Sequence, residues 1–536
     1  MPNGTYGWCG REENESRTEN FSFPDLLYCK TRTKMKRSRY TLLKGWHKWI
    51  CLVVTILVLG FAGSGIILNH RDLVSGIDLP RSWLPKAYHY KSWSGGSLIG
   101  KIRATPDEEW IYGAAGVWAY DPQLKSYDSR SDGLDPGADR RSVQRVVRTN
   151  RGDLYALTAY SLYKWQADKK EWAKQPKLTP KNERLADLET QGDTLVLLSR
   201  SHLYLIFPSQ ESPTRADLPA PDDYEPRVSL FSTIWQIHSG AFFGTIGRLV
   251  VDLMGVALIL LSITGILITF VPKKAKVWKQ FLKEHNRWGK WCFWGLLFVT
   301  ITGAFLRPPL MITVIKAQVP TIPGTNLYST NPWNDKLRMI RRDPITKEWL
   351  LSTSRGFYAL KQFGKAPKRL TGTPPVSVMG LNVWEWSDRD SLWVVGSFSG
   401  AFRWNRQKGQ VYDALTGKAY TESGQKGMPI FGTPISGYTI DSDGRERFYS
   451  YSTGELQAED AADTMPPMPT EISPGRISLW HAALELHVGR LYEKILGPLQ
   501  PLYIFLSALL LILALTTGWM LYRRYYRRRG GKKPKK

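Results

Sequence analysis

Cysteine is scarce in this sequence and is absent from its two long polar stretches. The 536 residues include four cysteines, of which Cys9 and Cys29 lie near the N-terminus and Cys51 and Cys292 lie in apolar segments. No CxxC pair occurs. The sequence therefore excludes a disulfide framework in the polar stretches, and it excludes a zinc or dithiol motif of the CxxC type.

Several catalytic and nucleotide-binding motifs are also missing. No GxGxxG fingerprint follows a strand and opens a helix, and there is no P-loop. The chain therefore has no nicotinamide or flavin module of its own. It also lacks an HExxH zinc motif and a GxSxG nucleophile elbow, which argues against a hydrolase.

Acidic residues are nearly absent from three short segments that hold most of the excess charge. Residues 30–48, 272–290 and 523–536 together contain 24 Lys or Arg and one Glu, in a chain whose net charge is +26. These segments flank apolar runs closely, so we interpret them as membrane anchors and not as nucleic-acid-binding surfaces. The positive-inside rule places all three in the cytoplasm.

Four apolar segments are long enough to cross a bilayer. They are residues 49–69, 249–271, 291–315 and 501–522. Each has about 20 residues or more, the length that spans the hydrocarbon core as a helix. With the basic segments, they predict a four-pass protein that contacts the lipid bilayer, has both termini in the cytoplasm and exposes two large periplasmic regions.

The two polar stretches have an all-β pattern. Short aromatic or β-branched strand pairs start about 40 residues apart, three in each stretch, as in WIYGAAGVWAY and LWVVGSFSGAFRW. Such repeats are typical of propeller blades, and three blades per half would close a propeller only if both halves joined. Separate sandwiches are the alternative. The predicted fold class is a membrane α-helical bundle of four duplicated helices with a large all-β periplasmic region.

The predicted organisation has nine parts in chain order. They are an extension at 1–34 that is disordered or absent from the native chain, with translation starting at Met35; a basic segment and first span at 35–70; the first β half at 71–228; an interface helix and second span at 229–271; a basic loop at 272–290; a third span at 291–315; the second β half at 316–476; an interface helix and fourth span at 477–522; and a basic tail at 523–536.

The chain has eight histidines, and four of them occupy equivalent positions in a duplication. His47 and His285 each precede a small-residue glycine motif by 18 residues, and His238 and His487 each precede a long apolar run that ends in SITG or LTTG. Neutral imidazoles on opposing helices are usual axial ligands of b-type haem. We therefore predict two haems, one held by His47 with His285 and one by His238 with His487. His70 is an alternative ligand, and interfacial anchoring is the alternative role for all of them.

The helix motifs resemble those of the PepSY-associated transmembrane family. The resemblance rests on GWHKW and SGIILNH in the first span, on HSGAFFGTIGRLVVDLMGVALILLSITGILITF, on ITGAFLRPP, and on LHVGRLYEKILGPLQPLYIFLSALLLILALTTGWMLYRR. It covers about a third of the chain. Better-understood members look like reductases of siderophore iron in the bacterial inner membrane, and the resemblance implies that the same four histidines bind haem. No persuasive PepSY domain is visible in the polar stretches.

These observations predict a ferric-chelate reductase that passes electrons through two b haems to a periplasmic metal chelate, such as a ferric siderophore. The electron donor would be quinol or a separate reductase. Arg307, Trp235 and Trp480 are candidate substrate-binding residues because they lie near the outer ends of the predicted helices. The alternatives are a non-enzymatic membrane protein whose β regions bind a partner or ligand, and an accessory of iron or haem uptake.

Overall fold

The chain folds into two compact units. The computed structural model describes residues 23–121, 126–375, 380–420, 432–441, 444–456 and 467–530. The helical unit comprises Met1–Ile66, Phe231–Ile315 and His487–Lys536, and the β unit comprises Ile67–Leu230 and Lys316–Leu486. Residues 1–22 of the predicted extension lie outside the described residues, and the first helix already begins at Phe23, within the extension.

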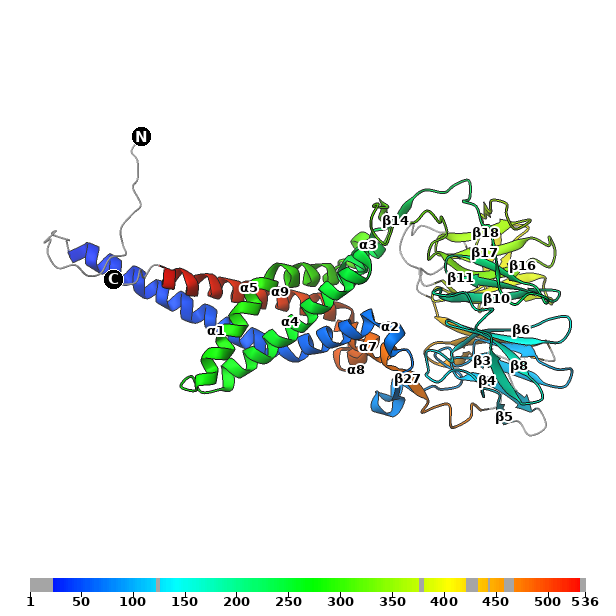
Figure 1. Cartoon of the computed structure of the whole chain (residues 1–536), viewed down its shortest axis with the longest axis horizontal. Helices are drawn as coiled ribbons and strands as arrows, with labels where there is room; N and C mark the ends of the chain where they lie inside the picture. The colour runs from blue at the N-terminus through cyan, green and yellow to red at the C-terminus, as the bar shows by residue number, and fades with distance from the viewer. Residues whose placement is uncertain are drawn as a thin grey trace. The chain divides into compact units, whose positions relative to one another are not determined.

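Four long helices form the body of the helical unit (Figure 1). They are α1 (Phe23–Asn69), α4 (Gly244–Phe270), α5 (Lys276–Ala304) and α9 (Tyr503–Gly530). The shorter helices are α3 (Leu230–Ser239), α6 (Met311–Val314), α8 (Glu493–Leu496) and 3-10 turns at Ala241–Phe243, Arg490–Tyr492 and Gly497–Leu502. Within the described residues, three stretches are long and apolar enough to cross a membrane: Tyr40–Asn69, Ala241–Phe270 and Arg490–Tyr526. The prediction of a membrane protein is confirmed.

The predicted third span, residues 291–315, differs from the helix that forms there. α5 begins at Lys276, inside the segment predicted as a basic loop, and ends at Ala304. The charged residues in the first half of α5 lower its mean hydropathy, so α5 is not among the three stretches that are apolar enough to cross a membrane. Pro308 and Pro309 follow closely, and a proline both lacks an N–H donor and disfavours a helical conformation in the residue before it. The apolar segment, which continues to residue 315, therefore extends beyond the end of the helix at Ala304.

Two buried clusters hold the four long helices together. In one, Val54 and Val58 of α1 pack against Ala514 of α9. In the other, Ala257 of α4 packs against Leu296 of α5. The small side chains of Ala514 and Ala257 let helix backbones approach closely, as in membrane helix packing generally.

Six antiparallel meanders make up most of the β unit. Five described sheets have four strands and the sixth has three, and in each sheet consecutive strands are neighbours. Sheet 1 contains β2 (Gly100–Arg103), β3 (Glu109–Gly113), β4 (Gly116–Asp121) and β5 (Ser126–Ser129); sheet 2 contains β6 (Val143–Arg148), β7 (Leu154–Thr158), β8 (Leu162–Gln166) and β9 (Glu171–Lys174); sheet 3 contains β10 (Leu185–Gln191), β11 (Thr194–Ser199), β12 (Leu203–Ile206) and β13 (Thr214–Ala216). Sheet 4 contains β16 (Leu337–Arg342), β17 (Trp349–Thr353), β18 (Gly356–Leu360) and β19 (Lys368–Arg369); sheet 5 contains β20 (Leu381–Ser387), β21 (Leu392–Ser397), β22 (Gly400–Asn405) and β23 (Gln410–Asp413); sheet 6 contains β24 (Ile435–Ile440), β25 (Glu446–Ser450) and β26 (Gly454–Leu456).

The sheets contact one another in sequence order through their first strands. β6 contacts β2, β10 contacts β6, β16 contacts β10, β20 contacts β16 and β24 contacts β20. β24 also contacts β2, so the last sheet meets the first. Sheets 1–3 come from the first polar stretch and sheets 4–6 from the second. The two stretches therefore join in one β unit with three sheets from each. The repeat spacing predicted three repeats per stretch and left open whether the stretches join.

Short elements connect the meanders to the rest of the chain. β1 (Asp78–Pro80) pairs with β27 (Arg476–Ser478), and β14 (Arg227–Ser229) pairs with β15 (Gln318–Pro320). Each pair joins segments from the two halves of the sequence. The helices α2 (Arg71–Val74) and α7 (Leu479–His487) lie next to the first pair in the sequence.

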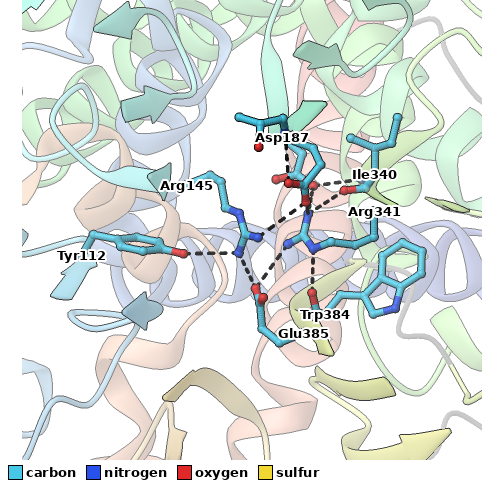
Figure 2. Close-up of polar contacts among 9 residues, drawn as sticks. Tyr112, Arg145, Asp187, Ile340, Arg341, Trp384 and Glu385 are labelled. Atoms are coloured by element: carbon cyan, nitrogen blue, oxygen red, sulfur yellow. Dashed lines mark hydrogen bonds and ion pairs between the residues drawn. The ribbon is translucent and has the colours of Figure 1, made fainter. Parts of the chain in front are cut away.

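A buried network of opposite charges joins the first strands of neighbouring sheets (Figure 2). Nη1 of Arg341 on β16 lies 2.5 Å from Oδ2 of Asp187 on β10, and these side chains are 5% and 3% exposed. Arg341 also donates from Nε to the carbonyl oxygen of Trp384 at 2.7 Å and lies 3.4 Å from Glu385 on β20. One guanidinium thus joins sheets 3, 4 and 5.

Arg145 on β6 extends this network to the first two sheets. It pairs with Glu385 and lies 3.7 Å from Glu189 of β10. It also donates a long hydrogen bond of 3.4 Å to the hydroxyl of Tyr112 on β3. Burial costs a charged group several kcal/mol unless opposite charges and hydrogen bonds compensate it, and here two arginines face three carboxylates.

We expect Arg341→Met to destabilise the β unit by about 3–5 kcal/mol, because it leaves the buried carboxylate of Asp187 without its partner. The transition can be followed by tryptophan fluorescence during urea unfolding of the detergent-solubilised protein. Arg103→Met is the control. The Arg103 side chain is 63% exposed, and its ion pair with Glu109 is long, at 3.9 Å, so its loss should change the stability little. Equal urea midpoints for the two variants would show that the network does not stabilise the unit.

Candidate functional site

Two pairs of histidine rings lie close together in the helical unit, one pair edge-on and the other tilted. The ring centroids of His47 on α1 and His285 on α5 are 6.4 Å apart. Those of His238 on α3 and His487, the last residue of α7, are 6.2 Å apart. The structure therefore brings together the same two pairs that the duplication in the sequence predicts.

Each of these imidazoles packs against a glycine of a neighbouring helix. A Cβ atom added at Gly518 of α9 would lie 2.9 Å from Cε1 of His47, and one at Gly303 of α5 would lie 2.7 Å from Cε1 of His238. The corresponding distances are 3.4 Å from Gly65 of α1 to His487 and 3.7 Å from Gly265 of α4 to His285. Carbon atoms prefer separations of about 3.5–4.0 Å, so at least Gly518 and Gly303 are required for the rings to fit.

A hydroxyl residue stands directly before each of these glycines and lies within hydrogen-bonding distance of the histidine Nδ1 atom. The distances to Nδ1 are 3.1 Å from Thr517 to His47, 3.0 Å from Thr264 to His285, 2.9 Å from Ser64 to His487 and 3.4 Å from Thr302 to His238. The carbonyl oxygen of Val299 is also 3.0 Å from Nδ1 of His238. The four sites thus share one pattern.

The hydroxyl hydrogen bonds determine which nitrogen of each ring carries the proton. Thr517 donates its hydroxyl proton to the carbonyl of Leu513 on its own helix at 2.7 Å, and the other three hydroxyls bond to carbonyls four residues back in the same way. A hydroxyl has one proton, so its oxygen acts as the acceptor for the histidine. This arrangement favours Nδ1 as the protonated nitrogen. The tautomer leaves the lone pair of Nε2 available to a ligand such as a metal ion.

Two helices connect the pairs. α1 carries His47 and, 18 residues later, Gly65; α5 carries His285 and, 18 residues later, Gly303. At a rise of 1.5 Å per residue, this spacing separates the two pairs by about 27 Å along each helix. That length is close to the hydrocarbon thickness of a bilayer, about 30 Å. The arrangement can therefore hold one group towards each face of a membrane.

The surroundings of the two pairs differ. Sγ of Cys51, one turn after His47, lies 3.6 Å from Nδ1 and 3.8 Å from Nε2 of that ring. Phe61 of α1 lies edge-on to His487, with ring centroids 5.6 Å apart. Among the described residues, no group of three or more His, Cys, Asp or Glu side chains could hold a bare metal ion.

The remaining predicted site residues have different positions. Arg307, after the end of α5, interacts electrostatically with His487. Trp235 on α3 is 51% exposed. His70, between α1 and α2, belongs to the β unit and is therefore not one of the four rings of the helical unit.

Trp480 has a structural role in the β unit. Its indole nitrogen donates to the carbonyl of Leu68 at 3.1 Å, and the guanidinium of Arg71 lies 4.0 Å from the centroid of its ring. Arg71 in turn pairs with Asp139 at 2.5 Å. These contacts already occupy both the indole nitrogen and one ring face, which leaves little of Trp480 for a substrate.

Sequence reasoning identified the histidines and glycines but missed the hydroxyl residues. Their signal was the dipeptide Ser-Gly or Thr-Gly, which occurs at Ser64, Thr264, Thr302 and Thr517. The residue before each glycine provides the hydrogen-bond acceptor.

Comparison with solved structures yields only distant similarity. The chain is similar to a structural genomics protein of unknown function from Bacteroides thetaiotaomicron, with 9% identity, a TM-score of 0.34 and coverage of 71% of each chain. It is also similar to a chain in an S. cerevisiae assembly of Dbp5, Nup159 and Gle1, with 8% identity, a TM-score of 0.31 and coverage of 69% of this chain and 91% of that chain. At these scores the similarity assigns neither fold nor function. No curated protein matches the chain.

A family model gives the informative match. The model described as the PepSY-associated TM region matches residues 16–271. This range includes α1, sheets 1–3, α3 and α4, and with them His47, His238 and two of the four hydroxyl-glycine pairs. The resemblance of the helix motifs to the PepSY-associated transmembrane family is thereby confirmed over residues 16–271.

Proposed function

We propose that this protein is a haem-containing electron-transfer protein of the bacterial inner membrane that reduces a metal chelate, with ferric siderophore iron as the preferred substrate. The observation that carries the proposal is the pairing of the four histidines. Each ring has its Nδ1 proton directed to an acceptor, and each packs on a glycine. Second-shell hydrogen bonds of this kind fix the tautomer and ring orientation of metal-binding histidines.

The spacing of the rings suits a cofactor with one metal ion between each pair. A metal bound to an imidazole nitrogen lies about 2 Å from it, which places the ring centroids of two opposing ligands about 6 Å apart. The observed separations are 6.4 and 6.2 Å. His47 with His285 and His238 with His487 would thus hold two b haems, and the glycines beside the rings make room for the imidazoles that would bind them.

For the topology, we propose four membrane crossings with α5 as the additional one. α5 packs against α4 and α9, which both belong to apolar spans, and its second half is apolar. The segments rich in Lys and Arg lie near the beginning of α1, between α4 and α5, and at the end of α9. The positive-inside rule then puts both termini in the cytoplasm and the β unit in the periplasm.

For the β unit, we propose a six-bladed propeller. The support is the cyclic order of contacts, in which each first strand contacts the next and β24 contacts β2. A β-bulge recurs near the beginning of the first strand in sheets 2–6, at equivalent positions of the ladder. Bulges repeated at one position indicate a repeated structural unit.

The chain's own residues would orient, insulate and connect the two redox centres. A bound b haem supplies one-electron chemistry by cycling its iron between the ferric and ferrous states. The apolar residues of α1, α4 and α9 exclude water between the histidine pairs. An electron donor such as quinol or a separate reductase would act near His47, and the anionic chelate, whose ferric ion would be reduced to ferrous iron, would bind near Arg307. Arg307 and the exposed Trp235 are the candidates for contacting that chelate.

We expect His47→Ala and His487→Ala each to remove about one of two haem equivalents, because each variant lacks an axial ligand of one haem. A pyridine haemochrome assay and dithionite-reduced spectra of the purified protein measure this loss. His89→Ala and His202→Ala, both in the β unit, are the controls. A folded native protein that stays free of haem when haem is supplied would contradict the proposal and favour ligand or partner binding by the β unit as the function. If haem is bound and can be reduced but a ferric chelate does not reoxidise it, an uptake accessory is favoured instead.

The glycines provide a second test, which leaves every histidine in place. Gly303→Ala would bring a methyl group within 2.7 Å of His238, so we expect displacement of that ring and loss of about one haem equivalent. Gly63→Ala is the matched control, since no atom lies within 4 Å of a Cβ added there. Unchanged haem content in Gly303→Ala would argue against ligation by His238.

The hydroxyl groups provide a test of redox tuning. Thr517→Val removes the acceptor for Nδ1 of His47, so the imidazole becomes a weaker electron donor. We expect a more positive midpoint potential for one haem and haem affinity about tenfold lower. Thr516→Val is the control, because the adjacent Thr516 hydroxyl bonds only within its own helix. Spectroelectrochemical titration measures both potentials, and identical titration curves for the two variants would contradict a role for Thr517.

A further inference from the structure

Three arginines lie side by side where the first strands of sheets 3 and 4 begin. Arg184 directly precedes β10, Arg200 directly follows β11, and Arg338 is the second residue of β16. Backbone hydrogen bonds connect these positions. The amide of Arg200 donates to the carbonyl of Arg184 at 2.9 Å, and the amide of Leu337 donates to the carbonyl of Arg200 at 3.0 Å. The three side chains therefore start from adjacent points of one edge of the β unit.

Only one of the three has a carboxylate partner in the described part of the chain. Arg200 lies 2.6 Å from Asp335. Arg338 donates to the backbone carbonyls of Asp335 and Leu337, at 2.9 and 2.8 Å. The half-buried side chain of Arg184 has neither an ion pair nor a hydrogen bond there. Two guanidinium groups thus have no ion-pair partner among the described residues, although the charges of Asp139 and Asp335 act on Arg184 and Arg338, respectively.

The arginines also repel one another. Burial, together with the charges of Arg200 and Arg184, lowers the pKa of Arg338 to about 10. Burial and the charges of Arg71 and Arg200 lower the pKa of Arg184. In the central network of the same unit, by contrast, Arg341 and Arg145 each face carboxylates. A partly buried cation without an ion pair is costly, so an anion bound between these arginines would stabilise the cluster.

We propose that Arg184, Arg200 and Arg338 form a binding site for a compact polyanion, a small molecule that carries two or more carboxylate or phosphate groups. The planar guanidinium groups offer paired N–H donors that match carboxylate and phosphate oxygens. A compact anion could contact three adjacent, recessed guanidinium groups together, whereas a broad membrane surface could not reach recessed side chains equally. Only the link to reduction of an anionic chelate depends on the proposed function; binding itself does not require haem.

The test is calorimetric titration of the full-length protein, in nonionic detergent at low ionic strength, with citrate and then with pyrophosphate. We expect one anion to bind per chain. Arg184→Gln and Arg338→Gln should each weaken binding about tenfold, because each removes charge-assisted hydrogen bonds. Arg151→Gln is the control, because Arg151 is 68% exposed and pairs with Asp193. Arg151 lies in the turn after β6, whereas the arginine cluster lies where β10 and β16 begin. Arg151→Gln should bind as the native protein does.

Stability separates a binding role from a structural one. Without anion, Arg184→Gln should unfold at the same temperature as the native protein or at a higher one, because it removes a partly buried charge that Arg71 and Arg200 repel. Citrate should raise the melting temperature of the native protein and of Arg151→Gln, and much less that of Arg184→Gln. The proposal is overturned if neither anion binds, if Arg184→Gln binds like the native protein, or if binding is seen only with vesicles of anionic lipid. None of these results depends on haem, so they leave the proposed function to its own tests.

Discussion

The helical unit depends on the single proton of each of four hydroxyl groups. In an apolar medium that proton must find an acceptor, and the carbonyl four residues back on the same helix is the nearest one. Once Thr517 has donated to Leu513, its oxygen can only accept, and His47 must present Nδ1–H to it. The direction of a hydrogen bond within one helix thereby determines the protonation of a ring on another. The adjacent glycine is what lets that ring come close enough.

Much of this arrangement could be predicted from the sequence, because the duplication repeats each histidine motif at an equivalent position. The pairing of His47 with His285 and of His238 with His487 followed from their equivalent positions relative to apolar runs. The role of the hydroxyls could not be predicted, because a Ser or Thr in an apolar helix has the same sequence signature whether its oxygen serves a second partner or none. The end of α5 was misjudged because hydropathy continues to residue 315, whereas Pro308 and Pro309 interrupt the backbone earlier.

The charge pairs of the β unit could likewise not be predicted from the sequence. Composition predicts a basic protein, but it does not distinguish Arg341, whose guanidinium meets Asp187 and Glu385, from Arg184, which meets no carboxylate among the described residues. Asp187 and Arg341 are 154 residues apart, and only the contact between β10 and β16 brings them together. Sequence spacing revealed the three strand pairs of each half because strand alternation is local. The pairing of charges between sheets is not local, and no periodicity encodes it.

Neither unit can be completed by one half of the sequence. In the β unit, sheets 1–3 end at β10 and its neighbours, which require β16 from the second half, and β2 likewise requires β24. In the helical unit, each histidine pair takes one ring from residues before 271 and one from residues after 284. A single half would expose both the edges of its outermost sheets and two unpaired imidazoles. Joining two copies in one chain removes both problems at once, because the same duplication that closes the contacts among the sheets also supplies the second histidine of each pair.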